Sequence, residues 1–213
     1  MYLGFGYWDL GFKRMNLPNK LTILRVALAF IFLFLLWARF PFSMFAAWIV
    51  FAAAVISDVY DGRIARRHGT VTDFGTLMDP VADKMIICAA FISFVQLPAT
   101  HVPAWMVVII ISREFIITSL RLLALSKGQV LAAGLWGKHK TVSQVASILI
   151  ILTFLASRDV AFALGIGGKF DELYGAHFAN FVYWLMLLTV ALTVGSGLYY
   201  LYENRGLFWE GKR

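Results

Sequence analysis

The chain has 213 residues, of which 61% are hydrophobic and only 15% are charged, and its mean hydropathy is +0.77. Soluble domains carry about a quarter charged residues, so this composition excludes one and indicates an integral membrane protein. The formal net charge of +7 suits contact with an anionic membrane leaflet. The single cysteine, Cys88, excludes a disulfide within the chain and any cysteine-based metal site.

Six apolar stretches are long enough to cross about 30 Å of hydrocarbon as helices. In chain order they lie at residues 21–38, 41–57, 84–99, 103–120, 142–157 and 178–202. We therefore predict an all-α membrane protein with six transmembrane helices, forming one domain over residues 20–213. The aromatic and basic residues of segment 1–19 are typical of a membrane interface. The glycine-rich segment 158–177 is predicted to be an outer loop with a short interfacial piece.

Basic residues fall mainly on one side of this six-helix arrangement. If the N-terminus is cytoplasmic, most Lys and Arg residues between the helices lie on the cytoplasmic side, and the opposite side receives only Arg39, Arg158 and Lys169. This asymmetry satisfies the positive-inside rule. It also places residues 58–83 at the cytoplasmic face.

Residues 58–83, DVYDGRIARRHGTVTDFGTLMDPVAD, contain five of the twelve acidic residues. Asp58 and Asp61 are spaced i, i+3, and Asp79 and Asp83 are spaced i, i+4, so each pair projects from one face of its own helix. Charges within a membrane cost about 2.5–3.5 kcal/mol each, and clustered carboxylates repel one another unless cations lie between them. Carboxylates are hard oxygen ligands that suit Mg²⁺ or Mn²⁺ rather than zinc. The spacing therefore predicts a four-carboxylate site for divalent cations.

Small residues and an arginine lie between these carboxylates. Gly62 and Ala65 leave the helix surface bare, which lets a ligand approach the backbone, and Arg66 can meet a phosphate. A pair of divalent ions can clamp both sides of a phosphoryl displacement. Asp73 lies outside the spacing of the other acids and is expected to cap the following helix. The stretch as a whole indicates phosphoryl transfer.

The spacing resembles the signature of the CDP-alcohol phosphotransferase (phosphatidyltransferase) family. The residues that match its fixed positions are Asp58, Asp61, Gly62, Ala65, Arg66, Gly75, Asp79 and Asp83. The resemblance implies six transmembrane helices, usually in a homodimer, with an active-site cavity at the cytoplasmic side. It also implies that the four paired aspartates hold two divalent ions and that Asp83 is the general base. Gly62, Ala65, Arg66 and Gly75 would shape the binding site of the CDP-lipid.

A second group of basic residues points to the acceptor. In the sequence ISREFIITSLRLLALSKG at 111–128, Arg113 and Arg121 lie eight residues apart and can face one side of the fourth helix. Lys138 and Lys140 lie just before the fifth apolar stretch. Cations beside a site built for a pyrophosphate suggest an acceptor that also carries a phosphate. Membrane anchoring under the positive-inside rule is the alternative interpretation.

Together with NLPNKLTILR at 16–25, these segments are similar to the bacterial phosphatidylglycerophosphate synthase branch of the family. That similarity implies transfer of a phosphatidyl group from CDP-diacylglycerol to sn-glycerol 3-phosphate, giving phosphatidylglycerophosphate and CMP. It implies a multi-pass protein of the bacterial inner membrane. Membrane lipids are expected as partners, and nucleic acid is not. Asn19 and Thr22 would line the CDP-lipid site. The residues that would bind the acceptor phosphate are Arg25, Arg113, Arg121, Lys138 and Lys140.

Two alternatives stay open from the sequence. The first keeps the reaction and changes the acceptor, as in a cardiolipin synthase that uses phosphatidylglycerol, or a relative that uses serine or inositol phosphate. The second is a divalent-cation transporter in which the aspartates form the ion path. Transport requires polar groups at or beyond the membrane midplane, whereas all four paired aspartates are expected near one face.

Overall fold

The structure is a computed structural model that describes the backbone of residues 17–38, 40–68, 73–126 and 135–205. Within these ranges, side chains are described for residues 23–38, 40–57, 84–125 and 140–205. Most of the expected interfacial segment, residues 1–19, therefore lies outside the described residues. No strand occurs in the described ranges and nearly all of their residues are helical, which confirms the all-α fold class.

Six long helices coincide with the six apolar stretches expected from the sequence. They are α1 (Leu17–Trp37), α2 (Ser43–His68), α3 (Asp73–Gln96), α4 (Ala104–Ser126), α5 (Leu135–Ala163) and α7 (Ala176–Glu203). Even α1, with 21 residues, is about 30 Å long at 1.5 Å per residue. Each long helix therefore reaches the length needed to cross the hydrocarbon of a bilayer.

The described side chains indicate contact with lipid. Two continuous helical segments, Lys140–Ala163 and Gly167–Glu203, are long and apolar enough to cross a membrane by length and composition. Large apolar side chains also lie exposed on α1, α4 and α7, among them Phe34, Phe115 and Trp184. Exposed apolar surface of this extent marks a membrane or protein contact. Both observations agree with the membrane protein that the sequence predicts.

The segment at residues 158–177 is largely helical, so the prediction of an outer loop is wrong. α5 continues to its end at Ala163, and the chain then turns where Gly165 adopts a left-handed φ of 77°. The short helix α6 (Gly167–Phe170) and the π-helical turn η2 (Asp171–Gly175) follow, and they lead directly into α7.

Contacts between α5 and this segment explain why it is helical. Arg158 Nε and Nη2 donate to the two carboxylate oxygens of Asp171, each at 2.6 Å. The Phe154 ring stacks on Phe178 and lies 5.4 Å from the Phe170 ring, measured between centroids. Glycine content alone predicted a loop, but these tertiary contacts override the low helix propensity of glycine.

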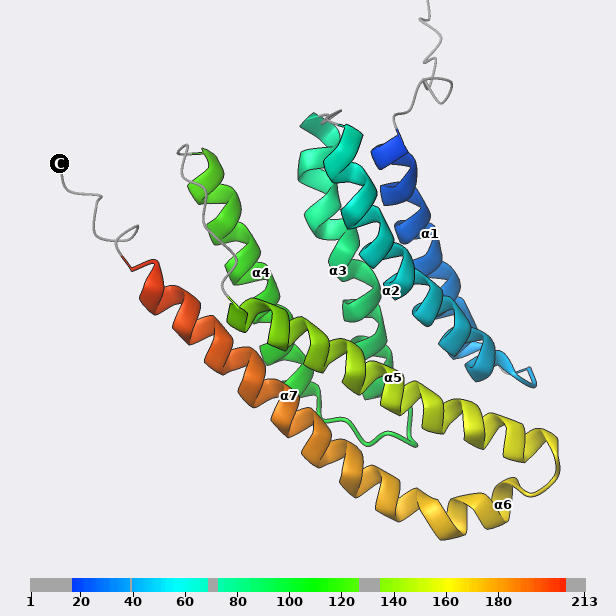
Figure 1. Ribbon diagram of the computed structural model, residues 1–213. Helices are drawn as coiled ribbons and strands as arrows, with labels where there is room; N and C mark the ends of the chain where they lie inside the picture. The colour runs from blue at the N-terminus through cyan, green and yellow to red at the C-terminus, as the bar shows by residue number, and fades with distance from the viewer. Residues whose placement is uncertain (1–16, 39, 69–72, 127–134, 206–213) are drawn as a thin grey trace, which may run out of the picture.

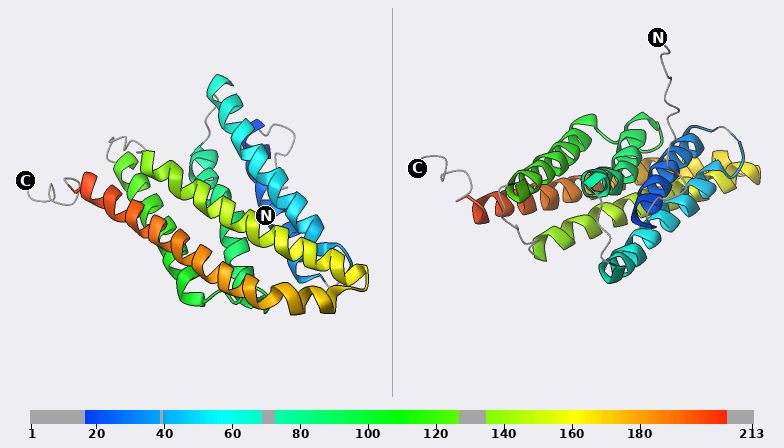
Figure 2. Two further views of the ribbon diagram at one scale, coloured as in Figure 1. Left: turned by 60° about the horizontal axis from the view of Figure 1, so that its bottom comes forward. Right: turned by 90° about the horizontal axis from the view of Figure 1, so that it is seen from above.

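The helices pack as two groups, α1–α3 and α4–α7, which meet where α2 and α3 pack against α5 and where α3 packs against α4. α1 packs against α2 and α3, α2 packs against α5, and α7 packs against both α4 and α5. Figure 1 shows α5 and α7 side by side as a long hairpin closed by α6, and Figure 2 shows the same hairpin from two further sides. The start of α1, the end of α2 and the start of α3 lie at the same end of the molecule (Figure 1). Fully buried core side chains include Phe32, Phe51, Phe91, Met106, Ile148, Leu152 and Met186.

Candidate functional site

The four paired aspartates lie on two helices that are continuous through these positions. Asp58 and Asp61 lie in the last three turns of α2, and Asp79 and Asp83 lie in the first three turns of α3. Helical backbone at these positions puts the members of each pair on one face of their helix, as the i, i+3 and i, i+4 spacings predict. α3 begins at Asp73, where the sequence predicted a helix start.

Several predicted site residues have a described backbone but side chains outside the described part. Besides the four paired aspartates, these are Asn19, Thr22, Gly62, Ala65, Arg66, Gly75 and Lys138. All lie in helices, namely α1, α2, α3 and α5. Among the side chains that are described, no three or more His, Cys, Asp and Glu residues gather into a possible metal site.

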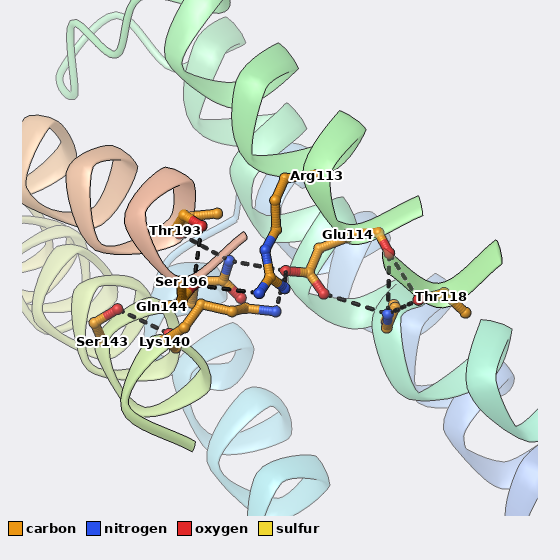
Figure 3. A network of polar contacts seen from close by, with 9 residues as sticks. Arg113, Glu114, Thr118, Lys140, Ser143, Gln144, Thr193 and Ser196 are labelled. Atoms are coloured by element: carbon orange, nitrogen blue, oxygen red, sulfur yellow. Dashed lines mark hydrogen bonds and ion pairs between the residues drawn. The ribbon is translucent and has the colours of Figure 1, made fainter. Parts of the chain in front are cut away.

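A buried carboxylate joins three basic side chains from three helices (Figure 3). Glu114 on α4 is 5% exposed, and its Oε2 lies 3.3 Å from Lys84 Nζ of α3. Its Oε1 lies 3.3 Å from Arg113 Nη1 and also forms an ion pair with Lys140 Nζ of α5. We call Lys84, Arg113, Glu114 and Lys140 the Glu114 cluster.

Hydrogen bonds fix the Glu114 cluster to α5 and α7. Gln144 Nε2 donates to Glu114 Oε1 at 3.3 Å and to Thr193 Oγ1 at 3.4 Å. Arg113 Nη2 donates to Ser196 Oγ at 3.2 Å. Gln144, Thr193 and Ser196 are all buried. Buried polar groups are costly unless they are hydrogen-bonded, and these contacts supply the partners. The network therefore holds the basic side chains in defined positions (Figure 3).

Glycine and threonine shape the space around the same side chains. A Cβ on Gly197 of α7 would lie 3.1 Å from Arg113 Cγ and 3.2 Å from Arg113 Nε, so the arginine packs directly on the bare helix. Lys84 Nζ also donates to Thr118 Oγ1 and, at 3.3 Å, to the main-chain carbonyl of Glu114. α4 is thus held to α3 on one side and to α7 on the other.

The cluster carries more positive than negative charge. One carboxylate faces three cations, and a fourth cation, Arg121, lies over the ring of Tyr200 with its Cζ 5.3 Å from the ring centroid. Lys140 is only 5% exposed, so water screens its charge poorly. Buried cations in excess of their partners favour an anionic ligand nearby.

Two cavities adjoin the Glu114 cluster. One of about 140 Å³ is lined by the cluster together with Thr118, Arg121, Thr141, Ser196, Tyr199, Tyr200 and Glu203, besides Ile117. The other, of about 500 Å³, shares Lys84, Glu114, Lys140 and Thr141 with the first and also has Arg25 in its wall. Most of its remaining lining is apolar and comes from α2, α3 and α5. A charged pocket and an apolar pocket therefore meet at the same four residues.

The structure brings together three of the five predicted acceptor-binding residues. Arg113, Arg121 and Lys140 line the 140 Å³ cavity, whereas Arg25 lines the neighbouring 500 Å³ cavity. The prediction did not include Lys84 or Glu114. A charged residue in a predicted transmembrane helix is a site candidate by itself, so Glu114 beside Arg113 was the signal that could have identified the cluster.

A larger cavity, of about 580 Å³, lies where α1 and α5 end, whereas the Glu114 cluster contacts the beginning of α5. Its charged side chains already have partners: Arg158 pairs with Asp171, and Asp159 Oδ2 accepts a hydrogen bond from the Met44 backbone N–H at 3.1 Å. Among the described residues that line it, positive and negative charges are balanced, since Arg158 and Asp159 are the charged ones. Size alone therefore does not make it the functional site, and the Glu114 cluster is the stronger candidate.

Comparisons with known proteins agree with the residue pattern. A sequence model of the family described as CDP-alcohol phosphatidyltransferase matches residues 15–195. A Bacillus subtilis protein named CDP-diacylglycerol–glycerol-3-phosphate 3-phosphatidyltransferase is 37% identical over 207 residues, covering 92% of this chain and 96% of its own.

Two further relatives carry related names. A Pseudomonas fluorescens protein with the same name as the Bacillus protein is 36% identical, over 72% of this chain and 84% of its own. A Mycobacterium tuberculosis protein named probable phosphatidylglycerophosphate synthase is 38% identical, over 68% of this chain and 70% of its own. On the extent of the family match and of these identities, the chain belongs to the CDP-alcohol phosphatidyltransferase family.

Proposed function

We propose that this protein transfers the phosphatidyl group of CDP-diacylglycerol to sn-glycerol 3-phosphate, forming phosphatidylglycerophosphate and releasing CMP. The observation that carries the proposal is the 140 Å³ cavity, whose walls hold Lys84, Arg113, Arg121 and Lys140 against the two carboxylates Glu114 and Glu203. This excess of cations suits an acceptor that carries a phosphate. The names of the Bacillus and Pseudomonas relatives support the same donor and acceptor.

The paired aspartates supply the donor half of the proposed site. The family is generally dependent on divalent metals. The donor set fits such ions, because Asp58 and Asp61 share one face of α2 and Asp79 and Asp83 share one face of α3, which offers four hard oxygen ligands. We infer that these residues hold two Mg²⁺ or Mn²⁺ ions. When bound, such ions neutralise the negative charge that develops on the pyrophosphate.

Residues of the chain would carry the other steps. Asp83 takes the proton from the acceptor hydroxyl, whose oxygen then forms a bond to the phosphorus attached to diacylglycerol. The bond from that phosphorus to the oxygen of CMP breaks, and CMP leaves with the electron pair. Gly62, Ala65, Arg66 and Gly75, with Asn19 and Thr22, would bind the CDP-lipid.

The basic residues would position the acceptor for that attack. Arg113, Arg121 and Lys140 would bind its phosphate in the 140 Å³ cavity. Arg25, in the wall of the adjoining 500 Å³ cavity, and Lys138, in the first turn of α5, are proposed to assist them. Holding the phosphate fixes the distance between acceptor hydroxyl and donor, which converts a bimolecular encounter into a positioned reaction. The adjoining 500 Å³ cavity, with its apolar walls, suits a donor whose tails remain in lipid.

We further propose the arrangement in the membrane. All six long helices would cross the bacterial inner membrane, with the aspartates at the cytoplasmic side and two copies of the chain in a homodimer. The excess of basic residues on one side of the six-helix arrangement supports this orientation. Residues 1–19 would lie in the membrane interface, ahead of a single transmembrane domain over residues 20–213.

The decisive assay follows CMP release by the purified full chain from CDP-diacylglycerol with Mg²⁺ or Mn²⁺. Glycerol 3-phosphate, phosphatidylglycerol, serine and inositol are supplied separately, and EDTA serves as the metal-free control. We expect release with glycerol 3-phosphate and little with the others. Preferred release with phosphatidylglycerol would instead indicate a cardiolipin synthase. Metal uptake into vesicles without any CMP release would overturn the enzymatic function.

A pair of variants tests the carboxylate site within the same assay. We expect Asp83→Asn to abolish CMP release while CDP-lipid binding is largely retained, because the amide cannot act as the general base. Asp73→Asn is the matched control, since Asp73 lies outside the paired spacing and asparagine also caps helices. Turnover by Asp83→Asn close to that of Asp73→Asn would disprove the role of Asp83.

A further inference from the structure

Tyr200 on α7 is a buried residue with an unused hydroxyl. It is 6% exposed and lines the 140 Å³ cavity beside the Glu114 cluster. Its Oη is out of contact with solvent and has no hydrogen-bond partner among the described residues. Arg113, in the wall of the same cavity, has a second buried donor, its Nε, which likewise has no hydrogen-bond partner among the described residues.

Neighbouring polar groups on the same helix are paired, so the free hydroxyl is not a general property of α7. Thr189 Oγ1 donates to the Leu185 carbonyl at 2.9 Å, and Ser196 Oγ donates to the Thr193 carbonyl at 2.9 Å. Buried tyrosine hydroxyls usually have a hydrogen-bond partner. A buried donor that lacks one beside a cavity is explained most directly by a ligand that binds there.

The surroundings of the hydroxyl define the chemistry of that ligand. The Arg121 guanidinium lies over the Tyr200 ring, 5.3 Å from its centroid, and Lys140 and Arg113 stand in the same cavity wall. Cations exceed carboxylates around the cavity, so the ligand is an anion. At about 30 Å³ for each water molecule, 140 Å³ holds about five waters, which is the scale of a phosphate group with part of a small polyol.

We propose that Tyr200 is an acceptor-binding residue that donates a hydrogen bond from its hydroxyl to the phosphate of the acceptor. The proposal rests on the function proposed above and adds a specificity-determining residue from the last helix. The ring holds Arg121 through a cation–π contact, and the hydroxyl adds a donor to the anion site. An acceptor without a phosphate leaves the hydroxyl without a partner and the excess positive charge of the cavity without compensation, and it is therefore rejected.

The test is Tyr200→Phe, which removes the hydroxyl and keeps the ring beneath Arg121. We expect the KM for glycerol 3-phosphate to rise about tenfold to a hundredfold, the loss typical of a hydrogen bond to a charged group. The KM for CDP-diacylglycerol and kcat at saturating acceptor should stay within about twofold of the wild type. The unfolding temperature without ligand should not fall, because phenylalanine leaves no buried donor unpaired.

Tyr202→Phe is the matched control, because Tyr202 is 67% exposed on the same helix. An unchanged KM for glycerol 3-phosphate in Tyr200→Phe would overturn the proposal. A lower unfolding temperature with an unchanged KM would do the same, by assigning Tyr200 a structural role. If the wild type itself releases no CMP with glycerol 3-phosphate, the proposed function fails first, which is visible before any variant is compared.

Discussion

Replacing Glu114 with glutamine removes the one negative charge that Lys84, Arg113 and Lys140 share. The amide keeps the size of the side chain but places a neutral group 3.3 Å from Lys84 Nζ and Arg113 Nη1. The three cations then repel one another in a site where water screens them poorly. We therefore expect Glu114→Gln to destabilise the fold as well as the site.

The structure sets the size of this effect. Removing one partner of a buried ion pair costs about 3–5 kcal/mol, because the remaining charge stays buried without compensation. The Lys84 side chain is 28% exposed and can turn toward solvent, so the lower limit of about 3 kcal/mol is the better expectation. For a chain of this length, that loss corresponds to a decrease in the unfolding temperature of roughly 6–12 °C.

Tryptophan fluorescence of the purified chain in detergent, followed during heating, measures this decrease. Glu172→Gln is the matched control, because it removes the same charge from a side chain that is exposed in η2. Its unfolding temperature should stay within about 2 °C of the wild type. The reasoning is refuted if Glu114→Gln unfolds at the wild-type temperature, or if the control falls by as much.

Two smaller changes test other contacts. Gly197→Ala puts a Cβ 3.1 Å from Arg113 Cγ, so we expect the KM for glycerol 3-phosphate to rise several-fold. Gly195→Ala is the control, because its Cβ would meet nothing within 4 Å, and it should leave this KM unchanged. Equal KM values for the two variants would contradict the packing argument. Arg158→Lys loses the two-pronged contact with Asp171 at 2.6 Å, and because both side chains are about one-third exposed the free energy of unfolding should fall by at most about 1 kcal/mol. CMP release should be unaffected by Arg158→Lys, and a large loss of it would show that the far end of α5 also controls the site.

Sequence alone predicted the parts of the protein that depend on local spacing. The six apolar stretches became six long helices, because length and hydropathy decide a helix in lipid with little help from tertiary contacts. The i, i+3 and i, i+4 spacings of the aspartates fall on continuous helix for the same reason. Segment 158–177 was mispredicted, since the helical form of its part after α5 depends on contacts with Arg158 and Phe154 of α5, which no local pattern reveals.

The acceptor side of the site was predicted only in part because its order comes from contacts between helices. Arg113 and Lys140 were identified as cations beside the site, but their shared carboxylate, Glu114, joins side chains of three separate helices, α3, α4 and α5. The polar residues of α5 and α7, such as Gln144 and Thr193, resembled ordinary positions in apolar spans. Their role appears only when the fold places them against Glu114.

Lys84 shows how the two halves of the proposed site are kept in register. Its Nζ binds Glu114 and Thr118 of α4, while its chain neighbour Asp83 is the proposed general base on α3. Adjacent Cα atoms are about 3.8 Å apart, so a shift of α3 relative to α4 cannot move the carboxylate without straining the Lys84 contacts. α4 is in turn tied to α7 through Arg113 and Ser196. The same ion pairs that concentrate positive charge for a phosphate therefore also fix the backbone that carries the base, which is why neutralising Glu114 should affect both stability and turnover.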